Sequence, residues 1–218
     1  MTRFTSFFAA LALLLATATA AHAQADWEAP LAAQLAAFEA DASPATLDAV
    51  NAAVARIAAA HPDAWLPSYY AARTEQMRHR YAGDDGCAEC VDAMDAHLAV
   101  AEAADNNSEV MTMRASYYQT MLGLHPMRAP FYGPKAGNLL ERAIEADRTN
   151  PRAASLLGQN YYYTPAMFGG GVKLAAPLLE RADVLYAAEA KTDRGLLPTW
   201  GAERNAAMSA KAAAELAE

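Results

Sequence analysis

The chain is 218 residues long and acidic, with 17 lysines and arginines against 25 aspartates and glutamates and a formal net charge of −8. Because its basic residues form no cluster that could follow a phosphate backbone, we expect no nucleic-acid partner. Alanine is abundant throughout and no run of alternating β-branched residues indicates a strand, so the composition predicts an all-α fold.

Residues 1–23 have the pattern of a cleavable signal peptide. Arg3 precedes an apolar run over residues 7–21, and Ala-His-Ala at its end is the small-x-small pattern that a signal peptidase accepts. The run is too short for a stable membrane span, and no cysteine follows it to take a lipid. We therefore expect cleavage near Ala23–Gln24, a periplasmic or secreted protein with no membrane span, and a single domain over residues 24–218.

Apolar side chains at helical spacing and recurrent capping residues divide the mature chain into nine expected helices. Ser43 followed by Pro44 is one start signal, because serine caps a helix and proline suits its first position. The segment from His125 to Gly133 is rich in proline, and we expect a non-helical connection there. The expected helices span about 27–40, 44–60, 62–80, 87–104, 108–124, 135–147, 151–164, 172–189 and 201–218.

Cys87 and Cys90 form a Cys-x-x-Cys motif at the start of the fourth expected helix. In an oxidising compartment we expect them to form a local structural disulfide. Redox catalysis is an alternative, because a helix N-terminus favours the thiolate, although the carboxylates within residues 84–92 raise the thiol pKa. A zinc site is a second alternative, but it would need His79 and His97, and His97 lies about 10 Å beyond Cys90 along the helix. We therefore expect no metal.

One apolar pattern occurs twice. Ala-x3-Leu-x2-Ala is found at residues 136–143 and again at 175–182, both times around Leu-Leu-Glu-Arg-Ala and after a loop with an aromatic residue and glycine. Residues three and four apart share a helix face, and small ones let a neighbouring helix approach closely. The repetition predicts stacked antiparallel helical hairpins whose second helices bury this pattern, with Gly158 and Ala182 as contact points.

Paired helices with a proline at the pair boundary resemble the tetratricopeptide repeat (TPR) superfamily. The positions that carry the resemblance in the best-matching unit are Pro151, Ala154, Leu157, Gly158 and Tyr161 in the first helix and Ala175, Leu179 and Ala182 in the second. The resemblance covers about residues 62–188. It implies a TPR-like α-solenoid of about three repeat units plus capping helices.

Two features depart from a regular TPR. Ser68 and Arg114 occupy positions where the family has a large apolar residue. The units are also long, with 42 residues from Ala101 to Ala143 and 39 from Ala143 to Ala182, against about 34 in a regular repeat. The loops inside the helix pairs are therefore expected to be longer than usual.

The sequence Tyr-Thr-Pro-x-x-Phe-Gly-Gly-Gly at residues 163–171 precedes an expected helix. It is similar to a loop of exported bacterial TPR-like proteins, among them the T-component associated with some TRAP-type solute transporters. The resemblance implies export and a scaffold role. A phosphate-binding loop is not expected here, because Gly-Lys-Ser/Thr is missing and the run follows a helix instead of a strand.

Tyrosine doublets recur in the first helices of the expected hairpins, at residues 69–70, 117–118 and 161–162. Adjacent side chains on a helix diverge by about 100°, so one tyrosine can pack while the next faces a groove. The alternative is that all of them pack in the core and between helices. The TPR register gives a candidate binding face on the first helices, made of Tyr70, Arg73, Gln119, Arg152, Gln159, Tyr162 and Tyr163.

This mixture of aromatic, amide and guanidinium groups suits an extended peptide or a small polar ligand. No nucleophile elbow or metalloprotease motif indicates an enzyme. We therefore expect a non-catalytic exported scaffold that binds a protein or peptide, with no cofactor. The alternative is a solute-binding accessory protein of a transporter, whose tyrosine-lined pocket would lie near the loop at residues 168–171.

Overall fold

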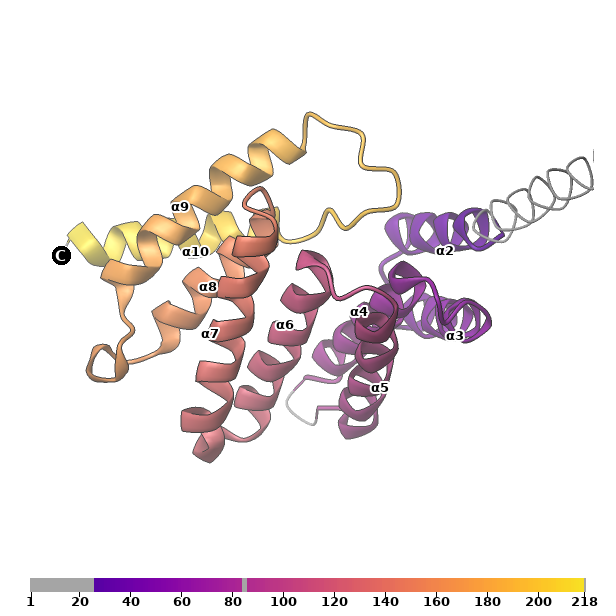
Figure 1. Ribbon diagram of the computed structural model, residues 1–218, viewed down its shortest axis with the longest axis horizontal. Helices are drawn as coiled ribbons and strands as arrows, with labels where there is room; N and C mark the ends of the chain where they lie inside the picture. Colours follow the sequence, from indigo (N-terminus) through magenta and orange to yellow (C-terminus); the bar gives the residue numbers. More distant parts are fainter. Residues whose placement is uncertain (1–25, 84–85, 218) are drawn as a thin grey trace, which may run out of the picture.

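The computed structural model describes residues 26–83 and 86–217 (Figure 1). Within these residues every regular element is a helix, which confirms the all-α prediction, and none of the helices is long and apolar enough to cross a membrane. The predicted signal peptide lies outside the described residues. The helices are α2 (Glu28–Ala40), α3 (Pro44–Ala60), α4 (Trp65–Tyr81), α5 (Ala88–Ala104), α6 (Ser108–Leu124), α7 (Ala129–Ala146), α8 (Pro151–Tyr163), α9 (Val172–Glu189) and α10 (Ala202–Ala217), with short 3-10 turns η2 (Pro126–Arg128) and η3 (Ala166–Phe168).

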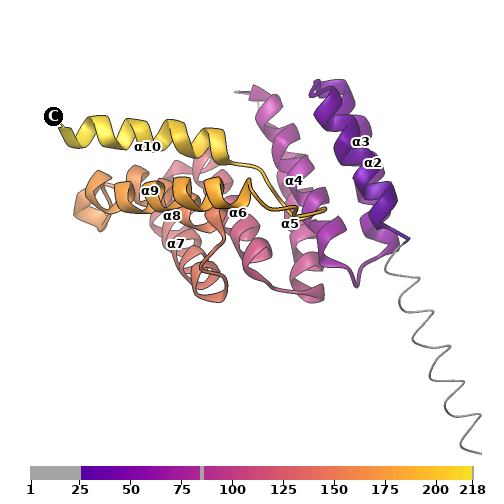
Figure 2. The same ribbon diagram turned by 90° about the horizontal axis from the view of Figure 1, so that it is seen from above.

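Consecutive helices pack as antiparallel hairpins. The closest packing joins α4 to α5, α6 to α7 and α8 to α9, and the first helices of these pairs, α4, α6 and α8, also contact one another in sequence. At one end of the row α3 packs on α4 and α2 packs on α3, and at the other end α10 packs on α9 (Figures 1 and 2). The first helices therefore share one side of the molecule.

The repeated apolar pattern is buried in the second helices of the hairpins, as expected. Its alanines and leucines at residues 136–143 and 175–182 are fully buried. Gly158 of α8 meets α9 so closely that an added Cβ would lie 2.8 Å from Cγ of Leu179. The predicted close approach at Gly158 is confirmed, because only a residue without a side chain fits there.

The prediction of a non-helical connection at residues 125–133 is wrong, because most of this segment forms η2 and the first turn of α7. Pro130 occupies an early position of α7, where its missing N–H costs nothing. Pro134 lies inside the helix, but the carbonyl that it leaves without a donor belongs to Pro130, in the first turn. Gly133 before it relieves the clash that proline imposes on a preceding side chain. The prolines therefore start this helix instead of preventing it.

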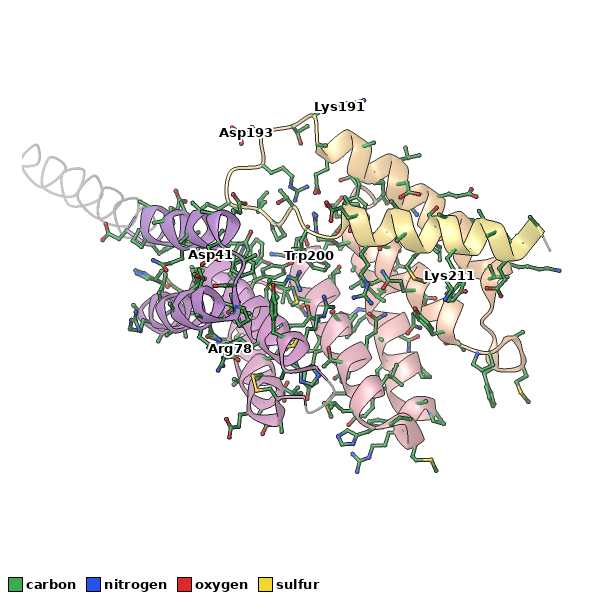
Figure 3. All side chains as sticks on the ribbon, turned by 180° about the vertical axis from the view of Figure 1, so that it is seen from behind. Asp41, Arg78, Lys191, Asp193, Trp200 and Lys211 are labelled. Carbon is green, nitrogen blue, oxygen red and sulfur yellow. A yellow bond between two sulfur atoms is a disulfide. The ribbon has the colours of Figure 1, made fainter. Side chains whose placement is uncertain are left out.

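The segment that joins α9 to α10, residues 190–201, is here called the strap. It leaves α9, runs back across the first helices towards α4 and returns to α10 (Figure 1). The Tyr70 hydroxyl donates a hydrogen bond to the Leu196 carbonyl at 2.8 Å, and Nε1 of Trp200 donates to the Tyr69 hydroxyl at 2.8 Å. Trp200 lies where the strap returns to the helices, whereas Asp193 lies at its outer edge (Figure 3). The strap is thus tied to α4 at two places.

Candidate functional site

The side of the molecule formed by the first helices contains a cavity of about 800 Å³, here called the arginine cavity. Its walls come from α4, α6 and α8, from the end of the strap and from the first turn of α10. Trp200 forms part of the wall, and the guanidinium of Arg73 lies 4.5 Å from the centre of its ring. The strap therefore closes a space that the hairpins alone would leave open.

Three arginines line this cavity, Arg73 and Arg80 from α4 and Arg204 from α10. Desolvation and the charge of Arg204 lower the pKa of Arg73. Desolvation and the charges of Arg73 and Arg204 lower the pKa of Arg80 to about 10. Within the described chain none of the three makes a salt bridge, and Glu203 is the carboxylate that shares the lining. The cavity thus concentrates positive charge that an anionic ligand would neutralise.

A second cavity of about 910 Å³, here called the apolar cavity, adjoins the first. It lies between the α6–α7 and α8–α9 connections and is lined largely by proline, glycine and aromatic residues. Gln119, Gly123, Gln159 and Arg204 belong to the walls of both cavities. The two cavities therefore adjoin along these residues, and together they are here called the groove, which is cationic at one end and apolar at the other.

Four of the expected binding residues lie in this groove. Arg73 lines the arginine cavity, Gln119 and Gln159 line both cavities, and Tyr163 lines the apolar cavity. The Gln119 amide donates to the Leu156 carbonyl at 3.0 Å, and the Gln159 amide donates to the Ser155 hydroxyl at 3.1 Å. These bonds fix the two amides, each of which keeps further hydrogen-bonding capacity for a ligand.

Arg152 does not face a ligand, and this expectation is corrected. Its side chain is 0% exposed, and its guanidinium donates to the carboxylates of Glu109 and Glu189, each at 2.7 Å. Arg194 of the strap joins the same cluster through Glu189 at 2.7 Å. Burial opposes the charge of Arg152, but hydrogen bonds to Glu189 and Glu109 raise its pKa above the ordinary value. Arg152 therefore holds α6, α9 and the strap together beneath the groove.

Tyr70 and Tyr162 do not line either cavity. Their hydroxyls instead form hydrogen bonds within the protein. The Tyr70 hydroxyl binds the strap, and burial raises its pKa to about 12. The Tyr162 hydroxyl donates to Glu215 of α10 at 2.6 Å, and Nζ of Lys211 lies 5.0 Å from the ring centre. These two tyrosines hold the strap and α10 against the hairpins.

Among the lining residues that the sequence did not place on the expected face, three bear directly on an anionic or aromatic ligand, namely Arg80, Trp200 and Arg204. Arg80 follows Arg73 by seven residues, about two helical turns, so same-face spacing could have identified it. Arg204 and Trp200 give no such signal, because their positions depend on how the strap folds back.

The predicted disulfide is confirmed, with Cys87 and Cys90 joined at 2.01 Å. The bridge lies at the start of α5, where the Cys87 N–H donates to Nδ1 of His79 at 3.0 Å. His79 in turn lines the arginine cavity. In the part of the chain that the structure describes, no group of three histidine, cysteine or carboxylate side chains could hold a metal ion.

The described residues thus form an all-helical protein with a groove that is cationic at one end and apolar at the other. No protein-family model matches the chain, and no curated protein matches it. Among solved structures it is similar to the HusA haemophore from Porphyromonas gingivalis, with a TM-score of 0.75 and 27% sequence identity over 88% of this chain and 94% of that one.

Proposed function

We propose that the groove binds an anionic small molecule with a large apolar face, and that haem or a related tetrapyrrole is its ligand. The observation that carries the proposal is the arginine trio at one end of a groove whose other end is apolar. A tetrapyrrole combines carboxylates with a broad apolar ring, and arginine is the side chain best suited to bind carboxylates. The likeness to the HusA haemophore supports the same ligand class.

The size of the groove supports a ligand of this kind. Cavities of about 800 and 910 Å³ fall in the range of small-molecule sites, about 300–1,000 Å³. Aromatic walls come from Trp200 in the arginine cavity and from Tyr161 and Phe168 in the apolar cavity. A flat ring could lie against these side chains while its carboxylates reach the arginines.

The strap favours a small ligand over the protein or peptide partner expected from the TPR resemblance. A peptide on a TPR-like surface would lie across the first helices, and the strap already occupies part of that side through its bonds to Tyr69 and Tyr70. The proposal therefore follows the alternative from the sequence, solute binding, but moves the site from the tyrosines to the arginines. Export through the predicted signal peptide is part of the proposal.

Titration with haemin tests this function. We expect a shifted Soret absorbance band on binding to the wild-type protein. Arg73→Gln and Arg204→Gln should each weaken binding by about tenfold or more, because a charge-assisted hydrogen bond to a carboxylate contributes roughly 1.5–3 kcal/mol. Competition by metal-free protoporphyrin measures how much of the affinity comes from the ring and its carboxylates.

Arg142→Gln is the matched control, because Arg142 is an exposed arginine of α7 outside both cavities. Its affinity for haemin should equal that of the wild type. An unshifted Soret band with the wild-type protein, or equal losses from Arg204→Gln and Arg142→Gln, would refute haem binding in this groove. Capture of unrelated peptides that haemin cannot displace would instead favour the scaffold function.

A further inference from the structure

The exposed apolar side chains of this protein gather at two hairpin ends. We name these the first tip, residues 124–135 around the α6–α7 connection, and the second tip, residues 163–174 around the α8–α9 connection. Of the eleven large apolar residues that are exposed in the described chain, the tips hold seven: Leu124, Met127, Phe131, Tyr163, Met167, Phe168 and Leu174. Single exposed apolar residues are ordinary, but a cluster of this kind marks an interaction surface.

The two tips are neighbours in space. The apolar cavity has walls from both, including Pro126 and Pro130 of the first tip and Pro165 and Phe168 of the second. Both hairpin ends lie on the same side of the molecule, at the lower left of Figure 1. The groove thus opens between them.

The tips are ordered turns that hold their apolar side chains outward. In the second tip the Phe168 N–H donates to the Pro165 carbonyl at 2.8 Å and the Gly171 N–H donates to the Tyr161 carbonyl at 2.8 Å. Gly169 adopts φ +84°, which completes the reversal of the chain. Met127 and Met167, one on each tip, are 94% and 82% exposed. Folding of this chain alone leaves these side chains in water.

The tips are basic, although the whole chain is acidic. No aspartate or glutamate occurs in residues 110–140 or in residues 148–179. Arg128, Lys135 and Lys173 are exposed on the tips, and Nζ of Lys135 lies 4.0 Å from the centre of the Phe131 ring. The neighbouring α4–α5 hairpin end differs, because Glu89 and Asp92 lie there beside the basic residues of the last turn of α4.

We propose that the two tips dock on a lipid surface with anionic headgroups. The thioether and aromatic side chains enter the boundary between headgroups and acyl chains, and Arg128, Lys135 and Lys173 contact lipid phosphates. Two separate projecting turns suit insertion into lipid better than the flat contact that a folded partner protein would need. This role goes beyond ligand binding and does not depend on the identity of the ligand.

Flotation with lipid vesicles tests the proposal. The exported protein is used, with its N-terminus checked by mass spectrometry so that the apolar segment at residues 7–21 is absent. We expect it to float with vesicles that contain phosphatidylglycerol, to float less with pure phosphatidylcholine, and to be released by high salt, which screens charge. Met127→Ser with Met167→Ser should reduce binding by at least about tenfold, because two exposed apolar side chains that line neither cavity no longer leave water.

Two pairs of matched variants keep the test specific. Val184→Ser with Leu216→Ser removes two apolar side chains that are exposed elsewhere, and should bind vesicles as the wild type does. Arg128→Gln with Lys173→Gln should lose the preference for phosphatidylglycerol. Arg142→Gln with Lys191→Gln removes as much exposed charge elsewhere and should keep that preference.

Three results would overturn the proposal. The first is a wild-type protein that floats with neither kind of vesicle, and the second is an equal effect of the tip variants and their controls. The third is a change of oligomeric state on gel filtration with Met127→Ser and Met167→Ser while vesicle binding is unaltered, which would assign the tips to contact between two copies of this chain. Haemin binding, measured on the same variants, is expected to persist, so failure of this proposal is distinguishable from failure of the proposed function.

Discussion

At the scale of single residues, the positive charges in the groove oppose folding and favour ligand binding. The lowered pKa values of Arg73 and Arg80 mean that the folded chain holds these protons less tightly than the unfolded chain does. The penalty is fully present below about pH 10, where Arg80 is charged, and fades as the pH rises above its folded pKa. An anionic ligand relieves the same repulsion.

Arg80→Gln should therefore stabilise the free protein while it weakens binding of haemin. Arg80 is exposed, so solvent screening limits the gain to less than about 1 kcal/mol, or up to about 3 °C in melting temperature. Thermal melting with and without haemin measures both effects. A lower melting temperature for the free variant would mean that Arg80 is stabilised by its surroundings and that the charges do not repel.

For the wild-type protein the same pKa predicts how affinity depends on pH. Affinity for haemin should fall as the pH rises through about 10, because Arg80 loses its charge there. Arg80→Gln lacks that titration, so its weaker affinity should change less over the same interval. Identical pH profiles for the two proteins would exclude Arg80 from the binding of the anion.

Arg152, in contrast, stabilises the fold, because its buried positive charge is paired with carboxylates. Arg152→Ala leaves the buried Glu109 and Glu189 with Arg194 as their one remaining salt-bridge partner in the described chain, and should cost roughly 3–5 kcal/mol of unfolding free energy. Arg78 bonds Asp48 and Glu75 at a partly exposed site, so Arg78→Ala should cost at most about 1 kcal/mol. Urea denaturation compares the two variants. Equal costs would show that the buried cluster is worth no more than a surface pair.

At the scale of the helices, the sequence predicts the elements well where a local signal sets them. Ser43, Asn107 and Asn150 each cap the helix that follows by accepting a backbone N–H bond. The start of α7 was misplaced because a proline inside the first turns of a helix carries the same local signal as a loop. The strap has no periodicity at all, so its course across α4 depends on tertiary contacts alone.

The close packing of α8 on α9 at Gly158 predicts the direction in which an alanine substitution changes stability. Alanine is favoured over glycine inside a helix by about 1 kcal/mol, but at Gly158 its Cβ would meet Leu179 at 2.8 Å. We expect Gly158→Ala to destabilise the protein. Gly123→Ala in α6, where nothing lies within 4 Å, should be neutral or stabilising. Urea denaturation that shows a gain at both positions would mean that α8 and α9 can separate at little cost.

At the scale of the whole molecule, the candidate site is assembled from parts that are distant in the chain. The bonds from Tyr70 to Leu196 and from Trp200 to Tyr69 span 126 and 131 residues. The face of the first helices, with Arg73, Gln119 and Gln159, could be predicted because each hairpin packs against its neighbours. Arg204 could not, because a long-range return of the chain brings it to that face.

Because the groove is assembled from these distant segments, a bound ligand should slow amide hydrogen exchange in each of them. Haemin should slow amide hydrogen exchange in α4, in α6 and α8, and in the strap and first turn of α10, since these segments form the walls of the groove. Exchange in α2 and α3 should change little, because neither helix contributes a residue to the walls of the groove. Protection confined to α2 and α3 would place the ligand outside the groove, and protection confined to the two tips would leave the arginine cavity out of the binding site. The strap is the decisive segment, since only a ligand enclosed beneath it slows exchange there and in α4 together.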